Sequence, residues 1–254
     1  MKRILKNYLI IKALSLNELK VKYKRNVLGF FWSLLNPILN ISLISIVFSK
    51  IMEMSYKDFV LFLTPAIMAW NLFVNIINSC SNCLIYNERL IRNTNIDKFI
   101  FPLVSTTTTL VDFFLAFTSL LTLYFLLFFA KIHIAIFIIP FSILLLTIFA
   151  FSIGTIISIV NIYFRDIGYI VNVLLQILFF LTPILYQKSR LGTFVNLAKI
   201  NPMLHFIDLF RDPIYYGNLP SSETFLITAA WSLGMFLVSY NLLNKLKDQI
   251  IFRL

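Results

Sequence analysis

The stretch LKVKYKRNVLGFFWSLLNP, residues 19–37, changes within a few positions from cations to a mostly apolar series. Four of its first seven residues are lysine or arginine, and aromatic side chains follow at Phe30, Phe31 and Trp32. In a membrane protein, cations stay in the cytoplasm beside anionic head groups and aromatic residues sit at the interface, while the apolar segment enters the bilayer. The stretch therefore predicts the start of a first membrane span and the orientation of the chain.

The composition of the whole chain supports a membrane protein. Of its 254 residues, 59% are hydrophobic and 13% are charged, and 27 are phenylalanine; the mean hydropathy is +0.87. Soluble domains carry about 25% charged residues, and a soluble core of this size has no room for so much apolar surface. The net charge of +11 comes from cations at the ends of apolar runs, so we expect membrane lipids, and no nucleic acid, as partners.

Six runs with few or no charges are long enough to cross a bilayer. They cover residues 26–49, 59–87, 99–130, 132–164, 167–187 and 224–244. The first, at 24 residues, would extend about 36 Å as a helix, enough to span the hydrocarbon core with some tilt. The sequence predicts an all-α integral membrane protein with six transmembrane helices. We expect a single transmembrane domain over residues 1–254. Spans one to five would lie in residues 26–187, and span six with a cytoplasmic tail in residues 224–254.

Two segments outside these runs have helical patterns of their own. Residues 1–25 alternate cations and aliphatics, which favours a helix lying in the membrane interface; an amphipathic helix against a soluble partner is the alternative. Its expected apolar face holds Leu5, Tyr8, Leu9, Leu16, Leu19 and Tyr23. Residues 188–223 contain apolar pieces too short to span, and Asn201-Pro202 is typical of a helix start. We expect short re-entrant helices there, before the last span.

The distribution of cations predicts the orientation. If the N-terminus is cytoplasmic, 15 of the 22 lysines and arginines fall in inner segments and 7 in outer ones. The excess of cations on one side favours both termini in the cytoplasm.

Enzymatic motifs are few. No glycine opens a G-x-x-x-x-G-K-[ST] phosphate loop, and no nucleophile has an evident partner base. Cys80 and Cys83 have the spacing of a redox or zinc pair, yet they end an apolar run without a second pair, which favours two small packing residues. The chain is therefore not expected to be a self-sufficient enzyme.

Two features have open interpretations. The inner loop at residues 86–98 is helix-compatible, and we expect it to expose Leu90 and Ile91 between Arg89 and Arg92; it is either a docking helix for a cytoplasmic partner or a solvated connector. The second feature is Asp112, an acidic residue that lies well inside an apolar run. A carboxylate at that depth needs a partner or a polar path, so it serves either a helix–helix contact or the substrate.

The motifs, taken in order, resemble a known family. LKVKYKRNVLGFFWSLLNPIL (19–39) resembles the first-span signature of type-2 ABC-transporter permeases that export bacterial polysaccharides, the Wzm-like and TarG-like exporters of O-antigen, capsule and teichoic acid. Further similar pieces are NERLIR (87–92) with FP (101–102), LVDF (110–113), NIYFRD (161–166), TPILY (182–186), NP (201–202) and LFR (209–211).

The resemblance implies a homodimer in the bacterial cytoplasmic membrane with two separate nucleotide-binding subunits. ATP and Mg²⁺ would be held by those subunits, with no cofactor on this chain, and the substrate would be a polyprenyl-diphosphate-linked polysaccharide. It also implies three groups of site residues. ATPase coupling would involve Glu88, Arg89, Leu90, Ile91, Arg92 and Asn93; the substrate entrance Lys22, Tyr23, Lys24, Arg25, Trp32 and Asp112; and the outer gate Tyr186, His205, Asp208 and Arg211.

Other functions stay open at this point. A permease for a lipid, drug or other small substrate would share the same architecture. A membrane-embedded glycosyl- or acyltransferase would need a polar cluster at one membrane face, for which His205, Asp208, Arg211 and Asp212 are the best group. A channel or secondary transporter would normally carry more charge within its spans.

Overall fold

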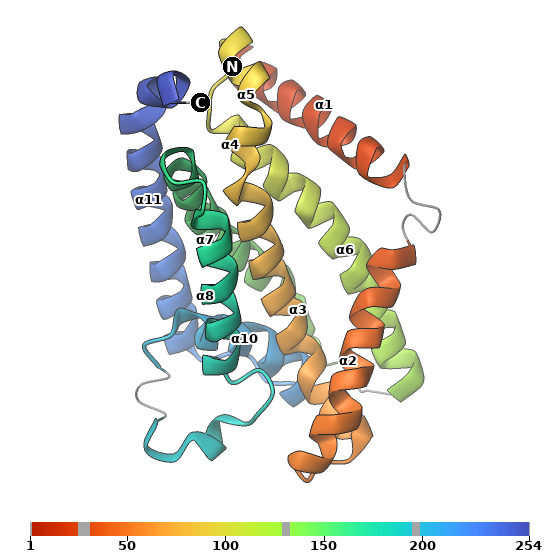
Figure 1. Ribbon diagram of the computed structural model, residues 1–254. Helices are drawn as coiled ribbons and strands as arrows, with labels where there is room; N and C mark the ends of the chain where they lie inside the picture. Colours follow the sequence, from red (N-terminus) through yellow and green to blue (C-terminus); the bar gives the residue numbers. More distant parts are fainter. Residues whose placement is uncertain (1, 25–30, 129–132, 195–198, 254) are drawn as a thin grey trace.

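The computed structural model describes residues 2–24, 31–128, 133–194 and 199–253, and these residues form helices and loops without a strand (Figure 1). The longer helices are α1 (Lys2–Lys24), α2 (Phe31–Ile51), α3 (Tyr56–Ser81), α6 (Ile100–Phe128), α7 (Ile139–Tyr163), α8 (Ile167–Leu181) and α11 (Ser222–Arg253). Shorter ones are α4 (Cys83–Tyr86), α5 (Glu88–Asn93), η1 (Ile134–Ile138), η2 (Lys188–Phe194), α10 (Pro202–Arg211) and η3 (Asp212–Tyr216). The expected all-α class is confirmed.

Four helical stretches in the described chain are long and apolar enough to cross a membrane: Tyr56–Ser81, Ile100–Thr122, Ile134–Tyr163 and Ser222–Lys247. Two shorter apolar stretches, Leu35–Ile51 and Ile167–Leu181, accompany them. All six lie within, or overlap, the six predicted runs.

Three predicted boundaries differ from the observed ones. The fifth predicted run continues to residue 187, but α8 ends at Leu181 because Thr182 is extended, as a residue before proline prefers to be. The second run breaks at Asn82, where the side chain of Asn161 donates to the Ser81 carbonyl at 3.0 Å. The sixth predicted run ends at residue 244, but α11 remains helical to Arg253, because Leu243 and Ile250 are buried within the structure.

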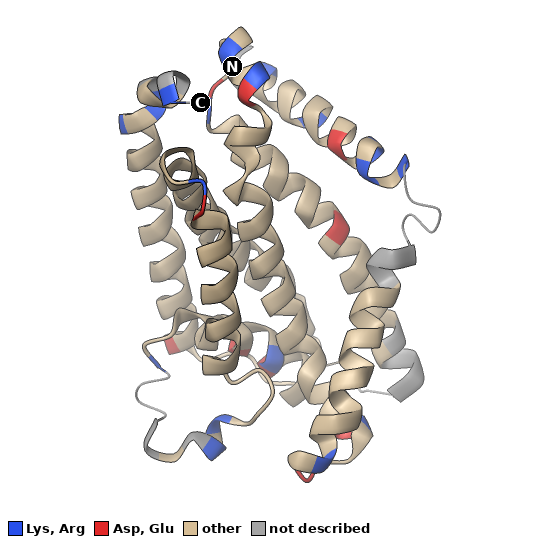
Figure 2. Ribbon diagram, viewed as in Figure 1, with Lys and Arg blue, Asp and Glu red and all other residues tan. Residues whose placement is uncertain are grey.

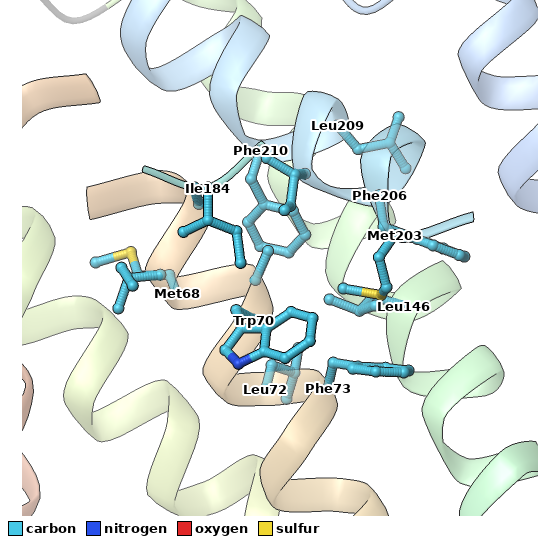
Figure 3. Close-up of a cluster of buried hydrophobic side chains, with 14 of the residues drawn as sticks. Met68, Trp70, Leu72, Phe73, Leu146, Ile184, Met203, Phe206, Leu209 and Phe210 are labelled. Carbon is cyan, nitrogen blue, oxygen red and sulfur yellow. The ribbon is translucent and has the colours of Figure 1, made fainter. Parts of the chain in front are cut away.

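The central helix is α3, which contacts α2, α6, α7 and α10. Its start is capped by Ser55, whose hydroxyl accepts from the Asp58 amide at 3.1 Å. The rings of Phe73, Phe149 and Phe206 stack in sequence, with centroids 5.8 Å and 4.8 Å apart, and so join α3, α7 and α10. Figure 3 shows Phe73 and Phe206 within a cluster that also holds Trp70, Leu146 and Met203.

A close approach between α3 and α7 depends on Gly154. A Cβ atom at that position would lie 2.7 Å from the Cβ of Cys80 and 3.4 Å from the Cα of Ile77. Small residues at such crossings let two membrane helices come together. Cys80 is therefore a packing residue here, buried with its sulfur 3.3 Å from the Thr106 hydroxyl.

The two termini and α5 lie at one end of the bundle, and α10 with the η2 segment lies at the other (Figure 1). Charged residues gather mainly at these two ends and along α1 (Figure 2). The predicted helix start at Asn201-Pro202 is confirmed: the Asn201 side chain caps α10 by accepting from the Met203 amide at 3.0 Å.

Candidate functional site

Helix α1 is attached to α6 through polar side chains. Lys22 and Tyr23 both donate to the carboxylate of Asp112, each to a different oxygen. One turn earlier on each helix, the Thr108 hydroxyl donates to Glu18 at 2.9 Å. Asp112, whose side chain is 18% exposed, thus has a cation and a hydroxyl as partners, as a carboxylate on an apolar helix requires.

The expected apolar face of α1 is only partly uncovered: Leu19 and Tyr23 are half-buried, and Tyr23 contacts α6, whereas the other four residues are exposed. Leu5, Tyr8, Leu9 and Leu16 are between 47% and 62% exposed, whereas Ser15, on the face toward α6, is 4% exposed. The helix therefore contacts α6 through the side chains of Glu18, Lys22 and Tyr23 and leaves these four apolar side chains uncovered within this chain, which is the arrangement expected of a helix that borders lipid.

A cavity of about 510 Å³ opens beside the Lys22–Asp112 pair, between the end of α1 and helices α2, α3 and α6. Its lining consists of Lys22, Tyr23, Asn36, Pro37, Asn40, Met68, Asn71, Asn75, Ser79, Thr109, Asp112, Phe113, Ala116, Phe117 and Leu120. This volume lies within the range of about 300–1,000 Å³ that small-molecule sites occupy. We call it the asparagine cavity, after the side chains that dominate its polar surface.

Four asparagines from two helices meet in this cavity. Asn36 and Asn40 are four residues apart on α2, and Asn71 and Asn75 are four apart on α3. Residues spaced by four share one helix face, so each helix presents a short amide row. These residues were not predicted as site residues from the sequence; their signal was the i, i+4 asparagine spacing within apolar runs.

The charge of the lining is balanced. Among the described lining residues, Lys22 and Asp112 are the charged ones, and they form an ion pair. Lys24 is exposed and is not part of the lining. Of the expected entrance residues, the structure thus brings Lys22, Tyr23 and Asp112 together at one site. Arg25 and the side chain of Trp32 lie outside the described residues.

Other lining residues are aromatic or apolar. The rings of Phe113 and Phe117 on α6 stack with centroids 5.3 Å apart, and both residues line the cavity together with Met68 of α3. A cavity lined by both amide groups and aromatic rings offers both hydrogen bonds and apolar contact to a ligand.

The expected outer-gate residues form a second cluster, at the end of the bundle that holds α10. The Arg211 guanidinium donates to the carbonyls of Pro183 and Ile184, both at 3.0 Å, and lies 4.0 Å from the Phe62 ring centroid. Asp208 pairs with Lys188, and a ring nitrogen of His205 is 3.2 Å from the Lys199 carbonyl. Tyr186 donates its hydroxyl to the Phe180 carbonyl at 3.1 Å.

Burial shapes the charge state of this cluster. It lowers the pKa of Arg211 to about 10, which still leaves the side chain cationic at neutral pH, while Asp208 raises that pKa. Burial raises the pKa of the Asp208 carboxyl, and the nearby Lys188 lowers it. The contacts of these side chains tie α10 to the turn after α8, so they stabilise this end of the bundle rather than leaving reactive groups available.

Helix α5 carries the expected ATPase-coupling residues. Glu88 and Arg92 form an i, i+4 ion pair at 2.9 Å, and Arg89 and Asn93 are exposed beside them. Leu90 is 37% exposed. The expectation that Ile91 is exposed is wrong: it is 1% exposed, because it packs with Leu84, Phe101, Ile159, Leu243 and other apolar side chains at this end of the bundle.

The described residues contain no group of three or more His, Cys, Asp or Glu side chains arranged to hold a metal ion.

Comparisons with known proteins agree with this architecture. The sequence profile of the family described as ABC-2 type transporter matches residues 10–215. The O-antigen export system permease protein RfbA of Myxococcus xanthus is 24% identical over 244 residues, which are 94% of this chain and 93% of that protein. A protein of the same name from Klebsiella pneumoniae is 25% identical over 239 residues, 94% of this chain and 92% of the relative.

Proposed function

This chain belongs to the ABC-2 type transporter family, and from that premise we propose that it is the permease subunit of an ATP-driven exporter of lipid-linked polysaccharide of the O-antigen type. The observation that carries the proposal is the extent of the likeness. Two relatives named as O-antigen export permeases align over 94% of this chain and over 92–93% of their own lengths. Because the alignment covers nearly all of each protein, we infer that this chain and these relatives share one architecture.

As a member of this family the chain is a multi-pass membrane protein and a transport subunit. We place it in the bacterial cytoplasmic membrane with both termini inside, as the distribution of its cations favours. The exposed apolar side chains of α1, which include Leu5 and Leu9, would contact lipid on the cytoplasmic side.

ATP and Mg²⁺ would be held by two nucleotide-binding subunits beneath a homodimer of this chain. The absence of a phosphate-binding loop in the sequence supports a separate ATPase. Helix α5 would be the docking element, with Arg89, Leu90 and Asn93 exposed and Ile91 anchoring the helix to the bundle. A helix with one buried anchor can transmit a displacement of its exposed side into the membrane part.

The substrate entrance would lie where α1 meets α6, beside the asparagine cavity. The outer end would be closed by the short helices η2, α10 and η3; the Lys188–Asp208 contact joins η2 to α10, and Arg211 holds α10 against the turn after α8.

The proposal predicts a clear cellular phenotype. Deleting the gene should remove the polysaccharide from the cell surface while polyprenyl-linked glycan accumulates inside, and affinity purification of the chain should recover a soluble ATPase. A strain that keeps its surface polysaccharide, or a chain that transports without an ATPase, would contradict the proposal.

Paired substitutions on α5 test the coupling role. Leu90→Asp should leave the chain at normal abundance in the membrane but reduce recovery of the ATPase and stop export, because Leu90 is at the exposed side of the helix. Ile91→Asp should instead lower the abundance of the chain itself, since burying an unpaired carboxylate destabilises a fold by several kcal/mol. If Leu90→Asp supports normal export, α5 is only a connector.

The alternatives make different predictions. A permease for a lipid or drug would leave surface polysaccharide unchanged after deletion and alter sensitivity to that compound. A transferase would use the outer cluster, but Arg211 is engaged by two backbone carbonyls and Asp208 by Lys188. Those contacts favour a structural role for the cluster.

A further inference from the structure

We propose that the asparagine cavity is a binding site for a neutral sugar unit, which its amide side chains recognise by hydrogen bonding. The inference rests on the proposed function, because it names the part of the exported substrate that this site would hold. It concerns a site within one copy of the chain, lined by α1, α2, α3 and α6.

The amides supply the right chemistry for sugar hydroxyls. A hydroxyl group both donates and accepts, and an asparagine side chain offers two N–H donors and a carbonyl acceptor. No hydrogen bond joins the side chains of Asn36, Asn40, Asn71 and Asn75 to another group in the described part of the chain. Asn36, Asn40 and Asn75 are also exposed. Their donors and acceptors are therefore available to a ligand.

The rest of the polar lining is consistent with the same ligand. The hydroxyl-bearing residues Ser79 and Thr109 line the cavity beside the amides, and Phe113 and Phe117 line another part of it. Sugar rings present hydroxyls at their edges and C–H groups on their faces, so they combine hydrogen bonds to amides with contact to aromatic rings. A lipid acyl chain, in contrast, has no group that forms hydrogen bonds with the four amides.

The charge balance separates a neutral sugar from an anionic group. A diphosphate or a uronic acid is bound best by arginine or lysine side chains that no carboxylate neutralises. Here Lys22 is already paired with Asp112, and the other described lining residues carry no charge. The cavity thus matches the sugar part of a lipid-linked glycan rather than its diphosphate.

Cysteine protection in the purified permease–ATPase complex tests the binding directly. Asn75→Cys, in a Cys80→Ala and Cys83→Ala background that removes the two native cysteines, places a thiol in the cavity. Neutral methyl hexosides should slow its reaction with a maleimide, whereas inorganic diphosphate should not. Asn95→Cys, at an exposed position on the inner loop outside the cavity lining, is the matched control and should react at the same rate with either compound.

Three outcomes would overturn the inference. Protection of the thiol in Asn75→Cys by diphosphate but not by hexosides would assign the cavity to a phosphate head group. Protection by neither compound, in a complex that still exports glycan, would show that the cavity is not a ligand site. Equal slowing of the control thiol would show that the hexosides act elsewhere.

Export variants give a second readout. Asn71→Leu and Asn75→Leu keep the side-chain size but remove the hydrogen bonds, so each should slow glycan export by about tenfold, the equivalent of roughly one hydrogen bond. Asn78→Leu, on the same helix but outside the lining, should export normally. Unchanged abundance in the membrane and unchanged thermal stability of the purified complex would exclude misfolding, and normal export by both cavity variants would contradict the inference.

The same experiments separate this inference from the proposed function. If deleting the gene leaves surface polysaccharide intact, the proposed function fails, yet hexoside protection of the thiol in Asn75→Cys would still report sugar binding. If deletion abolishes export but hexosides do not protect that thiol, only the inference about the cavity fails.

Discussion

At the scale of single residues, Asp112 connects the N-terminal helix α1 to the membrane helix α6. Its carboxylate accepts from Lys22 and Tyr23, so one side chain of α6 holds the last turn of α1. Asp112→Asn keeps an acceptor for Tyr23 but leaves Lys22 unpaired. Because the Lys22 side chain is 57% exposed, we expect a loss of only about 1 kcal/mol in the attachment of α1.

Disulfide trapping measures that attachment. Cysteines at Glu18 and Thr108, whose side chains are hydrogen-bonded at 2.9 Å, should cross-link efficiently in the wild-type background and several-fold less in Asp112→Asn. The exchanged pair Lys22→Asp with Asp112→Lys should restore much of the yield, and Lys20→Gln, an exposed cation on the same helix, should not change it. Equal cross-linking in Asp112→Asn would mean that the ion pair does not hold α1.

We expect Asp212 to make the end of the bundle that holds α10 sensitive to pH. Burial, reinforced by the nearby Asp208, raises its pKa from 3.8 to about 6, although Lys188 and Arg211 act in the opposite direction. A carboxyl whose pKa is higher in the folded than in the unfolded state binds its proton more tightly when folded, so its contribution to stability falls as the pH rises from about 4 to about 6.

Asp212→Asn should remove that dependence. The thermal stability of the variant in detergent should equal that of the wild type near pH 4 and exceed it from about pH 6 upward, since the neutral amide avoids the burial of a charge. Glu53→Gln, which alters an exposed carboxylate in the loop between α2 and α3, should follow the wild-type curve. A variant less stable than the wild type at pH 7 would show that the ionised Asp212 stabilises the fold.

Residue spacing predicted part of the candidate site and not the rest. Asp112 was identified because a charge within an apolar run is conspicuous, whereas Lys22 and Tyr23 were named through the resemblance of residues 19–39 to a known family. Asn71 and Asn75 were missed, because an uncharged amide in an apolar run has no fixed meaning until its neighbours are known. The asparagines of α2 and α3 line the same cavity because each helix is rotated so that its amides face the other helices. Hydrophobicity alone does not determine this rotation, since lipid accepts apolar side chains on any face of a helix.

At the scale of helices, the crossing of α3 and α7 should be sensitive to a single methyl group. Gly154→Ala places a Cβ 2.7 Å from the Cβ of Cys80, and neither atom can rotate away. The helices must separate, which we expect to destabilise the protein by about 1–3 kcal/mol. Thermal unfolding in detergent, followed by gel filtration, measures the change.

A second glycine provides the matched control for this prediction. Gly234→Ala, on α11, meets no atom within 4 Å and should be neutral or slightly stabilising, because alanine favours helices more than glycine does. Combining Gly154→Ala with Cys80→Gly returns the missing space and should recover part of the lost stability. If the two single alanine variants are equally stable, the α3–α7 contact is not limited by packing.

Helix ends were harder to predict from the sequence than helix positions, because the ends depend on local backbone signals and on contacts with distant residues. The end of α8 at Leu181 follows from Thr182 preceding Pro183, a local signal that the apolar run to residue 187 obscured. The burial of Ile91 was not foreseeable, because the side chains that cover it come from residues far away in the chain, such as Ile159 and Leu243.

At the scale of the whole molecule, the arrangement predicts which loops face each side of the membrane. The two termini and α5 lie at one end of the bundle, and η2, α10 and η3 lie at the other (Figure 1). With 15 residues, α8 extends only about 22 Å, less than the roughly 30 Å hydrocarbon core, so part of this group of short helices should lie within the membrane boundary on that side.

Cysteine labelling in intact cells tests this topology, starting from a chain without native cysteines. Ser189→Cys, exposed within η2, should react with a membrane-impermeant maleimide added outside, whereas Asn95→Cys, exposed beside α5, should react only after lysis. The opposite pattern would place the termini outside and remove α5 from reach of a cytoplasmic ATPase. Since α5 can meet such a subunit only from inside, this experiment decides whether the docking role proposed for Leu90 is sterically possible.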